Sequence, residues 1–296
     1  MHKTFYPIKT LILKKIVIFG VGLIGGSVAL ALKKADESTY IVGVDSLSVL
    51  NKAIKLRVID EKHIRLRSTL EDADIIILAT PVSKIPSILK DIKQYIEPYT
   101  IITDVGSTKL DVISAVNATL DEDQRGQFVP GHPIAGAEKS GVSAAKADMF
   151  INKAVVLTPI ENSKNLITIK SMWESIGAIP SIMTAAEHDQ IFASVSHLPH
   201  LLAFALVDEL SNRHNAHDLF AFAASGFRDF TRIAGSNPEM WRDISLANRN
   251  ALITEISAYK KKLDEINKLL EESDSRGLLK LFERASKARN DWGKKH

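Results

Sequence analysis

The 296-residue chain contains no cysteine. Disulfide bonds, a thiol nucleophile and a cysteine metal site are therefore excluded. The composition is compatible with a reducing compartment, and we expect a cytoplasmic protein. Aromatic residues make up only 6% of the chain, and the formal net charge is only +3. Because single-stranded nucleic acid is bound by basic grooves with interleaved aromatic side chains, no nucleic-acid partner is expected.

Long hydrophobic runs are also missing. The segment from Met1 to Lys14 has no apolar core followed by a small-residue cleavage site, so it does not resemble a signal peptide. No apolar run approaches the ~20 residues that span a membrane, so no membrane partner is expected. The chain does have a hydrophobic content of 45%. Its length suits about two domains of the usual ~100–200 residues.

A glycine-rich turn near the N-terminus follows the apolar run 16–19 and precedes a helical pattern. Gly20, Gly22 and Gly25 have G-x-G-x-x-G spacing. In this context the first glycine permits a tight turn, the second lets a pyrophosphate approach the backbone, and the third lets helix and strand pack closely. The N-terminus of the helix then offers free N–H groups to the phosphates. The pattern predicts a dinucleotide site.

An acidic residue supports the same site. Asp45 stands 20 residues after Gly25, at the end of a second apolar run, 41–44. A carboxylate there accepts hydrogen bonds from the adenosine ribose and repels a 2′-phosphate, which favours NAD over NADP. The residues expected to bind the cofactor are Gly20, Gly22, Leu23, Ile24, Gly25, Asp45, Thr80 and Pro81.

Strand and helix patterns alternate up to about residue 183, which predicts a doubly wound, mostly parallel sheet of the Rossmann type. From residue 184 onward only helical patterns occur, so we expect a dinucleotide-binding domain at 1–183 and an all-helical domain at 184–296. The expected strands are 16–19, 41–44, 73–79, 100–104, 127–129, 154–157 and 179–183. Thr80-Pro81, Gly106-Ser107 and Gly131-His132 follow strand ends and should therefore face one crevice.

Two polar residues at this crevice are candidates for chemistry. His132, in G-H-P-I-A-G, is either a proton acceptor near neutral pH or a loop histidine bonded to backbone. Ser107, in D-V-G-S-T-K, is interpreted as the N-cap of the following helix, or else as a hydroxyl beside the nicotinamide. Lys109 is expected to be a solvated charge.

The helical part carries a second group of candidates. Ser196, His197 and His200 lie in S-H-L-P-H, which lacks the carboxylate pattern of a zinc site, so no metal is predicted. The histidines are either buried and satisfied or bind a polar substrate, and Pro199 should kink the helix. Arg232 could hold a carboxylate in a bidentate fork, or pair with Asp229 on a helix surface.

Taken together, these motifs resemble those of the prephenate dehydrogenase family, the prephenate and arogenate dehydrogenases of tyrosine biosynthesis. The resemblance covers residues 15–255 and includes G-V-G-L-I-G-G-S, D-V-G-S-T-K, G-H-P-I-A-G, S-H-L-P-H and F-R-D-F-T-R-I-A with N-P-E-M-W-R-D. It implies an NAD-binding domain followed by a helical domain that forms most of a homodimer interface. The implied reaction is the oxidative decarboxylation of prephenate to 4-hydroxyphenylpyruvate.

The resemblance also implies roles for individual residues. His132 corresponds to the catalytic histidine that bonds the ring hydroxyl, and Ser107 to the serine near the nicotinamide. His200 corresponds to a substrate-binding histidine, and Arg232 to the arginine that holds a substrate carboxylate. The further substrate-binding positions are His197, Ser196, Glu138 and Trp241, the last of which could instead lie in the core or at the dimer interface.

Several alternatives stay open at this point. Ala137 replaces the family's threonine, which leaves arogenate or dual specificity possible beside prephenate. A β-hydroxyacid dehydrogenase would rely on a lysine in the helical domain, which is not the pattern of S-H-L-P-H. A non-catalytic dinucleotide sensor could keep Gly20 and Asp45 while losing the crevice residues, yet His132 and Arg232 are present.

Overall fold

The computed structural model describes residues 14–137, 139–160 and 163–294. The chain divides into two compact units, Met1–Asn248 and Arg249–His296. The boundary expected at 183/184 lies within the first unit and stays a prediction. Every candidate site residue belongs to the first unit.

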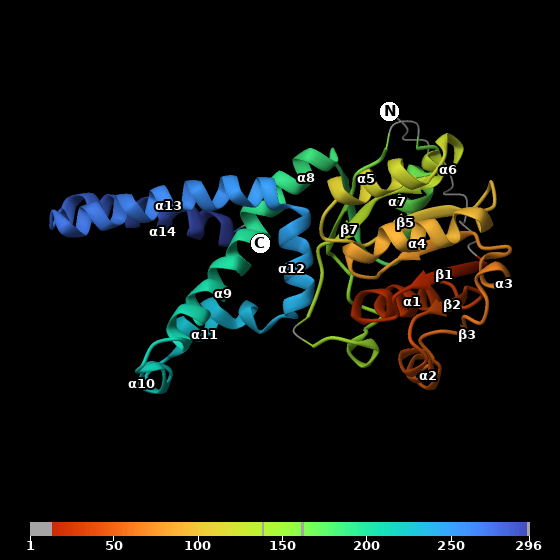
Figure 1. Cartoon of the computed structure of the whole chain (residues 1–296), viewed down its shortest axis with the longest axis horizontal. Coiled ribbons are helices and arrows are strands. Elements are labelled where there is room, and N and C mark those ends of the chain that lie inside the picture. The colour runs from red at the N-terminus through yellow and green to blue at the C-terminus, as the bar shows by residue number, and fades with distance from the viewer. Residues whose placement is uncertain (1–13, 138, 161–162, 295–296) are drawn as a thin grey trace, which may run out of the picture. The chain divides into compact units, whose positions relative to one another are not determined.

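A six-stranded parallel sheet organises the first unit, with strand order β3-β2-β1-β4-β5-β6 (Figure 1). This doubly wound order confirms the predicted fold class. The two-residue edge strand β3 was not predicted, because the dipeptide Glu61-Lys62 has no apolar signal. The strands are β1 Lys15–Phe19, β2 Tyr40–Val44, β3 Glu61–Lys62, β4 Ile75–Leu78, β5 Ile101–Asp104 and β6 Phe128–Val129.

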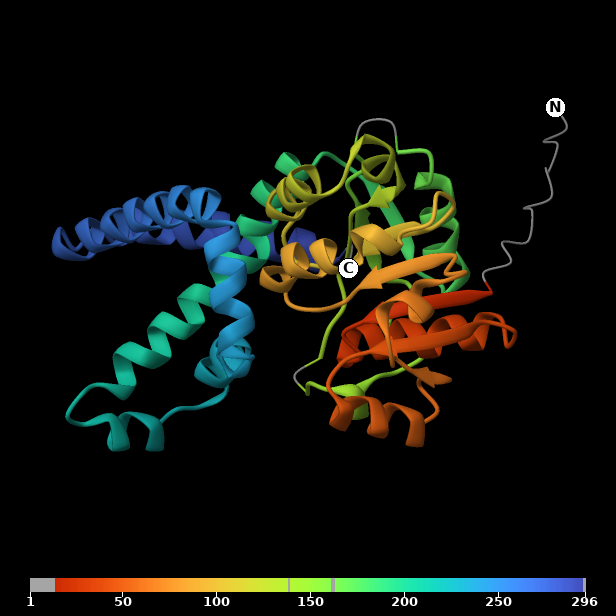
Figure 2. The ribbon, with the colours of Figure 1, turned by 45° about the vertical axis from the view of Figure 1, so that its right-hand side comes forward.

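Helices cover both faces of this sheet because successive strand residues point to opposite sides. Ile16 and Ile18 of β1 pack with α1 Leu23–Ala35, α2 Leu47–Lys55 and α7 Leu166–Ser175. Val17 and Phe19 pack in the other core, with α3 Leu66–Leu70, α4 Ile85–Ile92 and α5 Leu110–Thr119 (Figure 2). The short helix α6 Glu122–Gln127 precedes β6. The buried strands therefore account for the nearly continuous apolar runs in the sequence.

The last two predicted strands do not extend the main sheet. They form a second sheet in which β7 Gly131–Pro133 pairs antiparallel with β8 Ala154–Leu157, and β8 pairs parallel with β9 Ile179–Ile182. Pro130 separates β6 from β7, and a proline cannot donate to a sheet ladder. The chain leaves the main sheet at this point, so His132 lies on a strand and not on a loop as expected.

The remainder of the first unit is helical. A capping box between Thr184 and Glu187 begins the first helix. A π-helical turn, Ala193–His197, precedes Pro199, and the helix then continues to Ser211. The kink expected at Pro199 stays a prediction. Pro199 lies in the first turn of the helix Leu198–Ser211, where the backbone N–H that proline lacks is least needed. The helices are α8 Ala185–Phe192, α9 Leu198–Ser211, α10 Ala216–Ala221, α11 Ser225–Thr231 and α12 Pro238–Ala247.

The continuous helical segment Ala185–Ser211 is long and apolar enough to cross a membrane by length and composition alone. The expectation that no such segment exists was therefore wrong by that criterion. Core helices of soluble proteins pass the same test. His188, Asp189 and His197 on this segment are buried among groups of the first unit. Polar contacts of this kind are what a helix packed within a protein makes.

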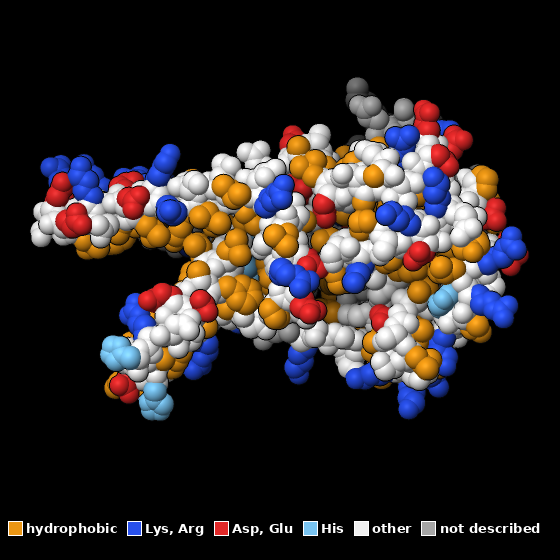
Figure 3. Space-filling view, in the orientation of Figure 1, with side chains coloured by type: hydrophobic (Ala, Val, Ile, Leu, Met, Phe, Trp, Pro, Cys, Tyr) orange, Lys and Arg blue, Asp and Glu red, His pale blue; other side chains and the backbone are white. Residues whose placement is uncertain are grey.

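The second unit is a helical hairpin of α13 Arg249–Glu271 and α14 Ser275–Gly293. The helical sequence pattern that runs over 240–270 is divided at Asn248 into α12 and α13. Asp274 caps α14 by accepting a hydrogen bond from Gly277 N at 2.9 Å. Hydrophobic side chains gather along the lower side of the hairpin in Figure 3, and Leu263, Leu279 and Phe282 are all exposed.

Candidate active site

The glycine turn has the geometry of a dinucleotide site. Gly20 has a φ of +89°, and a Cβ there would lie 2.5 Å from the carbonyl oxygen of Ala79. A Cβ on Gly25 would lie 2.0 Å from the Gly20 carbonyl oxygen. A Cβ on Gly22, by contrast, would meet no described atom within 4 Å, so this position faces open space. Tight packing at the first and third glycines and space at the second leave room for a pyrophosphate.

Other groups around this turn also fit a dinucleotide. Asp45 accepts a hydrogen bond from Val21 N at 2.9 Å, which holds its exposed carboxylate beside the glycine turn. The buried hydroxyl of Thr80, which precedes the exposed Pro81, has no hydrogen-bond partner within the described ranges. Leu23 and Ile24 begin α1, whose N-terminus has no side-chain cap. These residues fit a cofactor with a ribose and two phosphates.

A buried ion pair stands at the carboxyl end of β5. The side chain of Lys109 is fully buried, and its Nζ pairs with the Asp104 carboxylate and donates to the Gly131 carbonyl oxygen at 2.7 Å. Asp104 also accepts from Gly131 N at 3.1 Å. The expectation that Lys109 is a solvated charge was wrong, because its partners come from two different strands. The pair connects the Ser107 loop to the strand that carries His132.

Ser107 is half-buried in the loop between β5 and α5 and does not cap α5. The N-cap position is Lys109, and its N–H donates to Asp189 Oδ1 at 2.8 Å. The N–H of Leu110 donates to Asp189 Oδ2 at 2.9 Å. The N-cap interpretation of Ser107 was therefore wrong, because a carboxylate from α8 caps this helix.

His132 begins a chain of hydrogen bonds. Its Nδ1 lies 2.8 Å from Nε2 of His188, whose Nδ1 lies 2.8 Å from Asp189 Oδ1. The ring of Phe192 lies 4.9 Å from the His132 ring. Burial, together with the nearby rings of His188 and His197 and the Lys109 ammonium, holds the pKa of His132 well below its usual value. His132 is therefore a neutral imidazole at pH 7 and can accept a proton.

His197 is also buried, and it interacts with both Asn248 and the Ser107 backbone. Asn248 Nδ2 donates to the Asp189 carbonyl oxygen at 2.7 Å and to His197 Nδ1 at 3.1 Å. Burial lowers the pKa of His197 to about 4, and a hydrogen bond with the Ser107 backbone opposes that shift. This arrangement ties the π-helical turn to the Ser107 loop.

A second histidine of the S-H-L-P-H motif belongs to a different cluster. The His200 ring stacks on Trp241, with ring centroids 3.7 Å apart, and its Nδ1 donates to the Ser196 carbonyl oxygen at 2.9 Å. Burial lowers the pKa of His200, as does the guanidinium of Arg232 nearby. Trp241 is only 7% exposed, so it offers little surface to a partner subunit. The structure thus brings together Ser196, His200, Arg232 and Trp241.

Sequence reasoning missed three residues of the site, His188, Asp189 and Asn248. The adjacent His-Asp pair at the start of a helix was a signal, although nothing in the sequence showed what it would contact. Glu138, an expected substrate-binding residue, lies outside the described residues. Within the described ranges, no cluster of three or more His, Asp or Glu side chains could hold a metal ion.

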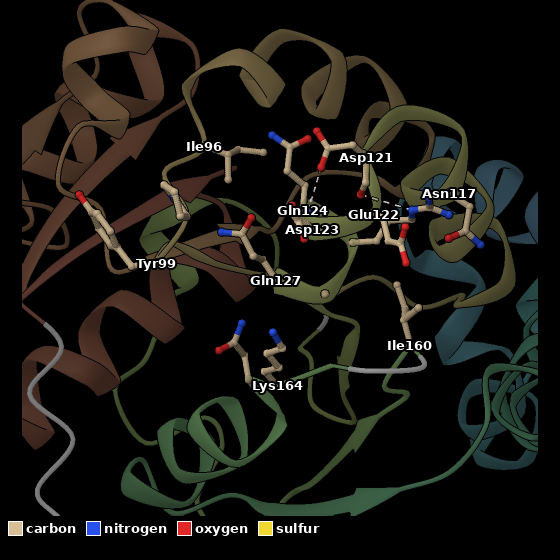
Figure 4. A pocket seen from close by; sticks show the side chains of 14 residues that line it. Ile96, Tyr99, Asn117, Asp121, Glu122, Asp123, Gln124, Gln127, Ile160 and Lys164 are labelled. Atoms are coloured by element: carbon tan, nitrogen blue, oxygen red, sulfur yellow. Dashed lines mark hydrogen bonds between the residues drawn. The ribbon is translucent and has the colours of Figure 1, made fainter.

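A separate surface hollow lies at the amino ends of β5 and β6 (Figure 4). Tyr99 and Gln127, which line it, lie within two residues of the starts of these two strands, and Asp121, Glu122 and Lys164 are among the other lining residues. Ligands of open parallel sheets bind at the carboxyl ends of the strands. The hollow therefore lies away from the predicted crevice and contains none of the predicted site residues.

Comparison with known proteins gives two family matches. Residues 28–181 match the nucleotide-binding domain of prephenate dehydrogenase, and residues 184–284 match its dimerization domain. The chain is 38% identical to prephenate dehydrogenase of Bacillus subtilis over 280 residues, which cover 93% of this chain and 75% of that protein.

Solved structures give the same result. The chain is similar to prephenate dehydrogenase from Aquifex aeolicus in complex with hydroxyphenyl propionate and NAD+, with a TM-score of 0.87 and 35% identity. That match covers 95% of this chain and 99% of the other. The arogenate dehydrogenase of Synechocystis matches with a TM-score of 0.78 and 31% identity, covering 94% and 99% of the two chains.

Proposed function

This chain belongs to the prephenate dehydrogenase family, and from that premise we propose how its residues carry out the reaction. The protein is an NAD-dependent oxidoreductase that converts prephenate to 4-hydroxyphenylpyruvate. NAD+ accepts a hydride from the ring carbon that bears the hydroxyl group. The ring carboxylate leaves as CO2, its bonding electrons complete the aromatic ring, and aromatisation makes the reaction effectively irreversible.

The N-terminal part of the first unit holds the cofactor. The backbone at Gly20, Gly22 and Gly25 and the N-terminus of α1 receive the pyrophosphate, with Leu23 and Ile24 on the first turn of that helix. Asp45 accepts hydrogen bonds from the adenosine ribose. Thr80 and Pro81 line the side of the crevice next to β4, and the buried Thr80 hydroxyl supports this assignment.

His132 accepts the proton of the substrate hydroxyl. As the hydride leaves, positive charge at the ring carbon is relieved when the hydroxyl becomes a carbonyl, and a neutral imidazole in contact with the hydroxyl takes up its proton. After CO2 has left, the phenolate oxygen recovers that proton, so His132 is restored. The observation that carries this role is the partly buried, neutral His132, hydrogen-bonded to His188, on the strand that Lys109 connects to the Ser107 loop. The Ser107 hydroxyl orients substrate and nicotinamide.

The cluster on the helical side anchors the substrate carboxylate. Arg232 supplies the charge and the fork of donors that suit a carboxylate. His200 and Trp241 form a stacked wall beside it, and Ser196 orients His200 through its carbonyl oxygen. We keep Glu138 as a further substrate contact on the strength of the family motif. His197 acts by holding the Ser107 loop.

Arogenate is the second candidate substrate. Arogenate carries an amino acid side chain where prephenate carries a keto acid, so selectivity depends on a few contacts to that side chain. Ala137, where the family has threonine, is exposed beside the G-H-P-I-A-G segment and removes one hydroxyl group from this region. Similarity to an arogenate dehydrogenase supports keeping this alternative, together with dual specificity.

The protein acts as a homodimer in the cytoplasm, with a functional boundary at 183/184. The match to a dimerization domain supports a dimer, as do exposed aromatic side chains on the helical part, including Phe220, Phe222 and Phe230. Exposed hydrophobic patches of this kind mark protein interfaces. The capping box at Thr184 begins the first helix beyond the proposed boundary.

An assay of NADH formation with prephenate, arogenate and a 3-hydroxy acid tests the proposal. We expect NADH and CO2 in equal amounts with prephenate. A higher kcat/KM with arogenate would move the assignment to arogenate dehydrogenase. Turnover of the 3-hydroxy acid alone would contradict the family chemistry, and NAD binding without turnover of any substrate would indicate a sensor.

A further inference from the structure

We propose that Asp189, acting through His188, fixes the tautomer of His132 so that its Nε2 is unprotonated and ready to accept the hydroxyl proton. This inference rests on the proposed role of His132. His188 and Asp189 are positioning residues, since they contact His132 or each other and not the reacting atoms. They lie on α8, whereas His132 lies on β7, so the helical part would determine the protonation pattern of a group in the nucleotide-binding part.

The hydrogen-bond partners of Asp189 are those that suit a carboxylate. Its Oδ1 accepts from Lys109 N, its Oδ2 accepts from Leu110 N, and backbone N–H groups can only donate. Both oxygens therefore act as acceptors, as the two oxygens of a carboxylate do. His188 Nδ1, 2.8 Å from Oδ1, must then be the donor in that contact.

The position of one proton determines the next along the chain. A neutral His188 with a proton on Nδ1 has a lone pair on Nε2. That Nε2 lies 2.8 Å from His132 Nδ1, so His132 donates from Nδ1 and has its own lone pair on Nε2. In general, the hydrogen-bond partner of one ring nitrogen determines which nitrogen of a histidine is protonated. The result is an acceptor that is oriented before substrate binds.

A second proton on His188 would reverse the pattern. His188 would then donate from Nε2, and a neutral His132 would carry its proton on Nε2, where it could not accept. That state would place a second positive charge at the fully buried His188, next to the ring of His132, which also feels the Lys109 ammonium. The other titratable groups around the pair are Asp104, paired with Lys109, and His197, which burial keeps neutral.

Nitrogen-15 spectroscopy of the histidine rings tests the proposal directly on the full-length protein. The chain has nine histidines, and comparison with the His132→Asn variant identifies the His132 signals. In the unliganded wild-type protein at pH 7, we expect His132 to have a protonated Nδ1 and an unprotonated Nε2, and His188 to show the same pattern. A wild-type His132 protonated on Nε2 would overturn the proposal.

Two variants add a kinetic readout. His188→Phe keeps an aromatic ring against Phe192 and leaves Asp189 free to cap α5, but it removes the acceptor of the His132 proton. We expect His132 to lose its preference for Nδ1 protonation and kcat to fall about tenfold to a hundredfold, less than the full ~10²–10⁴-fold of general-base assistance. KM and NAD affinity should stay within about twofold, as expected when only a transition-state interaction is lost.

His188→Gln is the conservative variant, since its amide oxygen can accept from His132 Nδ1, and it should recover part of kcat and the Nδ1-protonated signal. His217→Phe, at an exposed position, is the matched control and should change neither. A fall in kcat for His188→Phe with an unchanged His132 tautomer would overturn the proposal. Failure of the proposed role of His132 would look different: the tautomer would be as expected, while folded His132→Asn turned over normally.

Discussion

At the scale of single residues, the site depends on the protonation state and the location of its side chains. The identity of a residue alone does not determine either of them. His132 could be protonated or neutral at pH 7, and its burial next to Lys109 decides for the neutral form. Arg232 keeps its charge in any setting, so only its location decides its role.

His132→Asn should lower kcat by about 10²–10⁴-fold with a smaller change in KM. The pKa of His132 lies well below its usual value, so the neutral, active form persists as pH falls from 8 through 6. Wild-type kcat should therefore be flat over that range and decline only at lower pH, as His132 takes up a proton. That acid limb should vanish in the variant. Near-normal turnover by a folded variant with normal NAD affinity would contradict the proposed role.

Arg232→Ala should raise KM for prephenate while NAD affinity stays nearly unchanged. The loss of a charged hydrogen-bonding partner typically costs ~1.5–3 kcal/mol, which corresponds to about a tenfold to 150-fold change. Arg228→Ala removes an exposed arginine one helical turn earlier and is the matched control. Steady-state kinetics and NAD titration measure both effects. An equal KM for prephenate in the two variants would show that Arg232 does not bind the substrate carboxylate.

At the scale of elements, buried polar contacts hold the site together. Lys109 connects β5 to β7, and Asp189 of α8 caps α5. These contacts are made deep in the protein, where an unpartnered charge is costly. The orientation of His132 and Ser107 therefore depends on interactions among strands and helices that are distant in the sequence.

Lys109→Met should destabilise the protein by about 3–5 kcal/mol, because it leaves the Asp104 carboxylate buried without its partner. The double variant Asp104→Asn/Lys109→Met removes that charge and should recover part of the loss. Urea unfolding followed by circular dichroism measures the free energy of unfolding of each variant. If the single variant were as stable as the wild type, the pair would not stabilise the fold.

At the scale of the whole molecule, the helical part leaves several large hydrophobic side chains exposed in the single chain. Phe222 is 89% exposed and belongs to the segment that matches a dimerization domain. A two-fold contact between two such segments would bury these side chains on both partners at once. We therefore propose the homodimer because it would bury hydrophobic side chains that are exposed in the single chain.

Light scattering of the purified protein should give twice the 32.6 kDa of one chain. Phe222→Asp introduces a charge into the proposed interface and should shift the protein toward the monomer at low concentration. Ile64→Asp, at a similarly exposed position on the nucleotide-binding side, is the control and should leave the mass unchanged. A concentration-independent monomer for the wild type would rule out the dimer.

The sequence by itself determined the elements and their order. Apolar runs and glycines act over short distances, so the parallel sheet, the dinucleotide turn and the change to helices near residue 184 could be predicted. Several separate motifs in one order also identified the family. The same local signals did not predict the strands β3 and β7, which are short or polar. They also did not predict the division of the helices at Asn248.

Only the tertiary structure decided how the site residues act. The environment of Lys109 depends on Gly131, and the helix cap at Leu110 depends on Asp189, which lies 79 residues away. Hydrogen-bond geometry between such distant groups decides which ones are buried, charged or available to a substrate. No local pattern contains that information, because burial and electrostatic interactions arise from neighbours in space and not from neighbours in sequence.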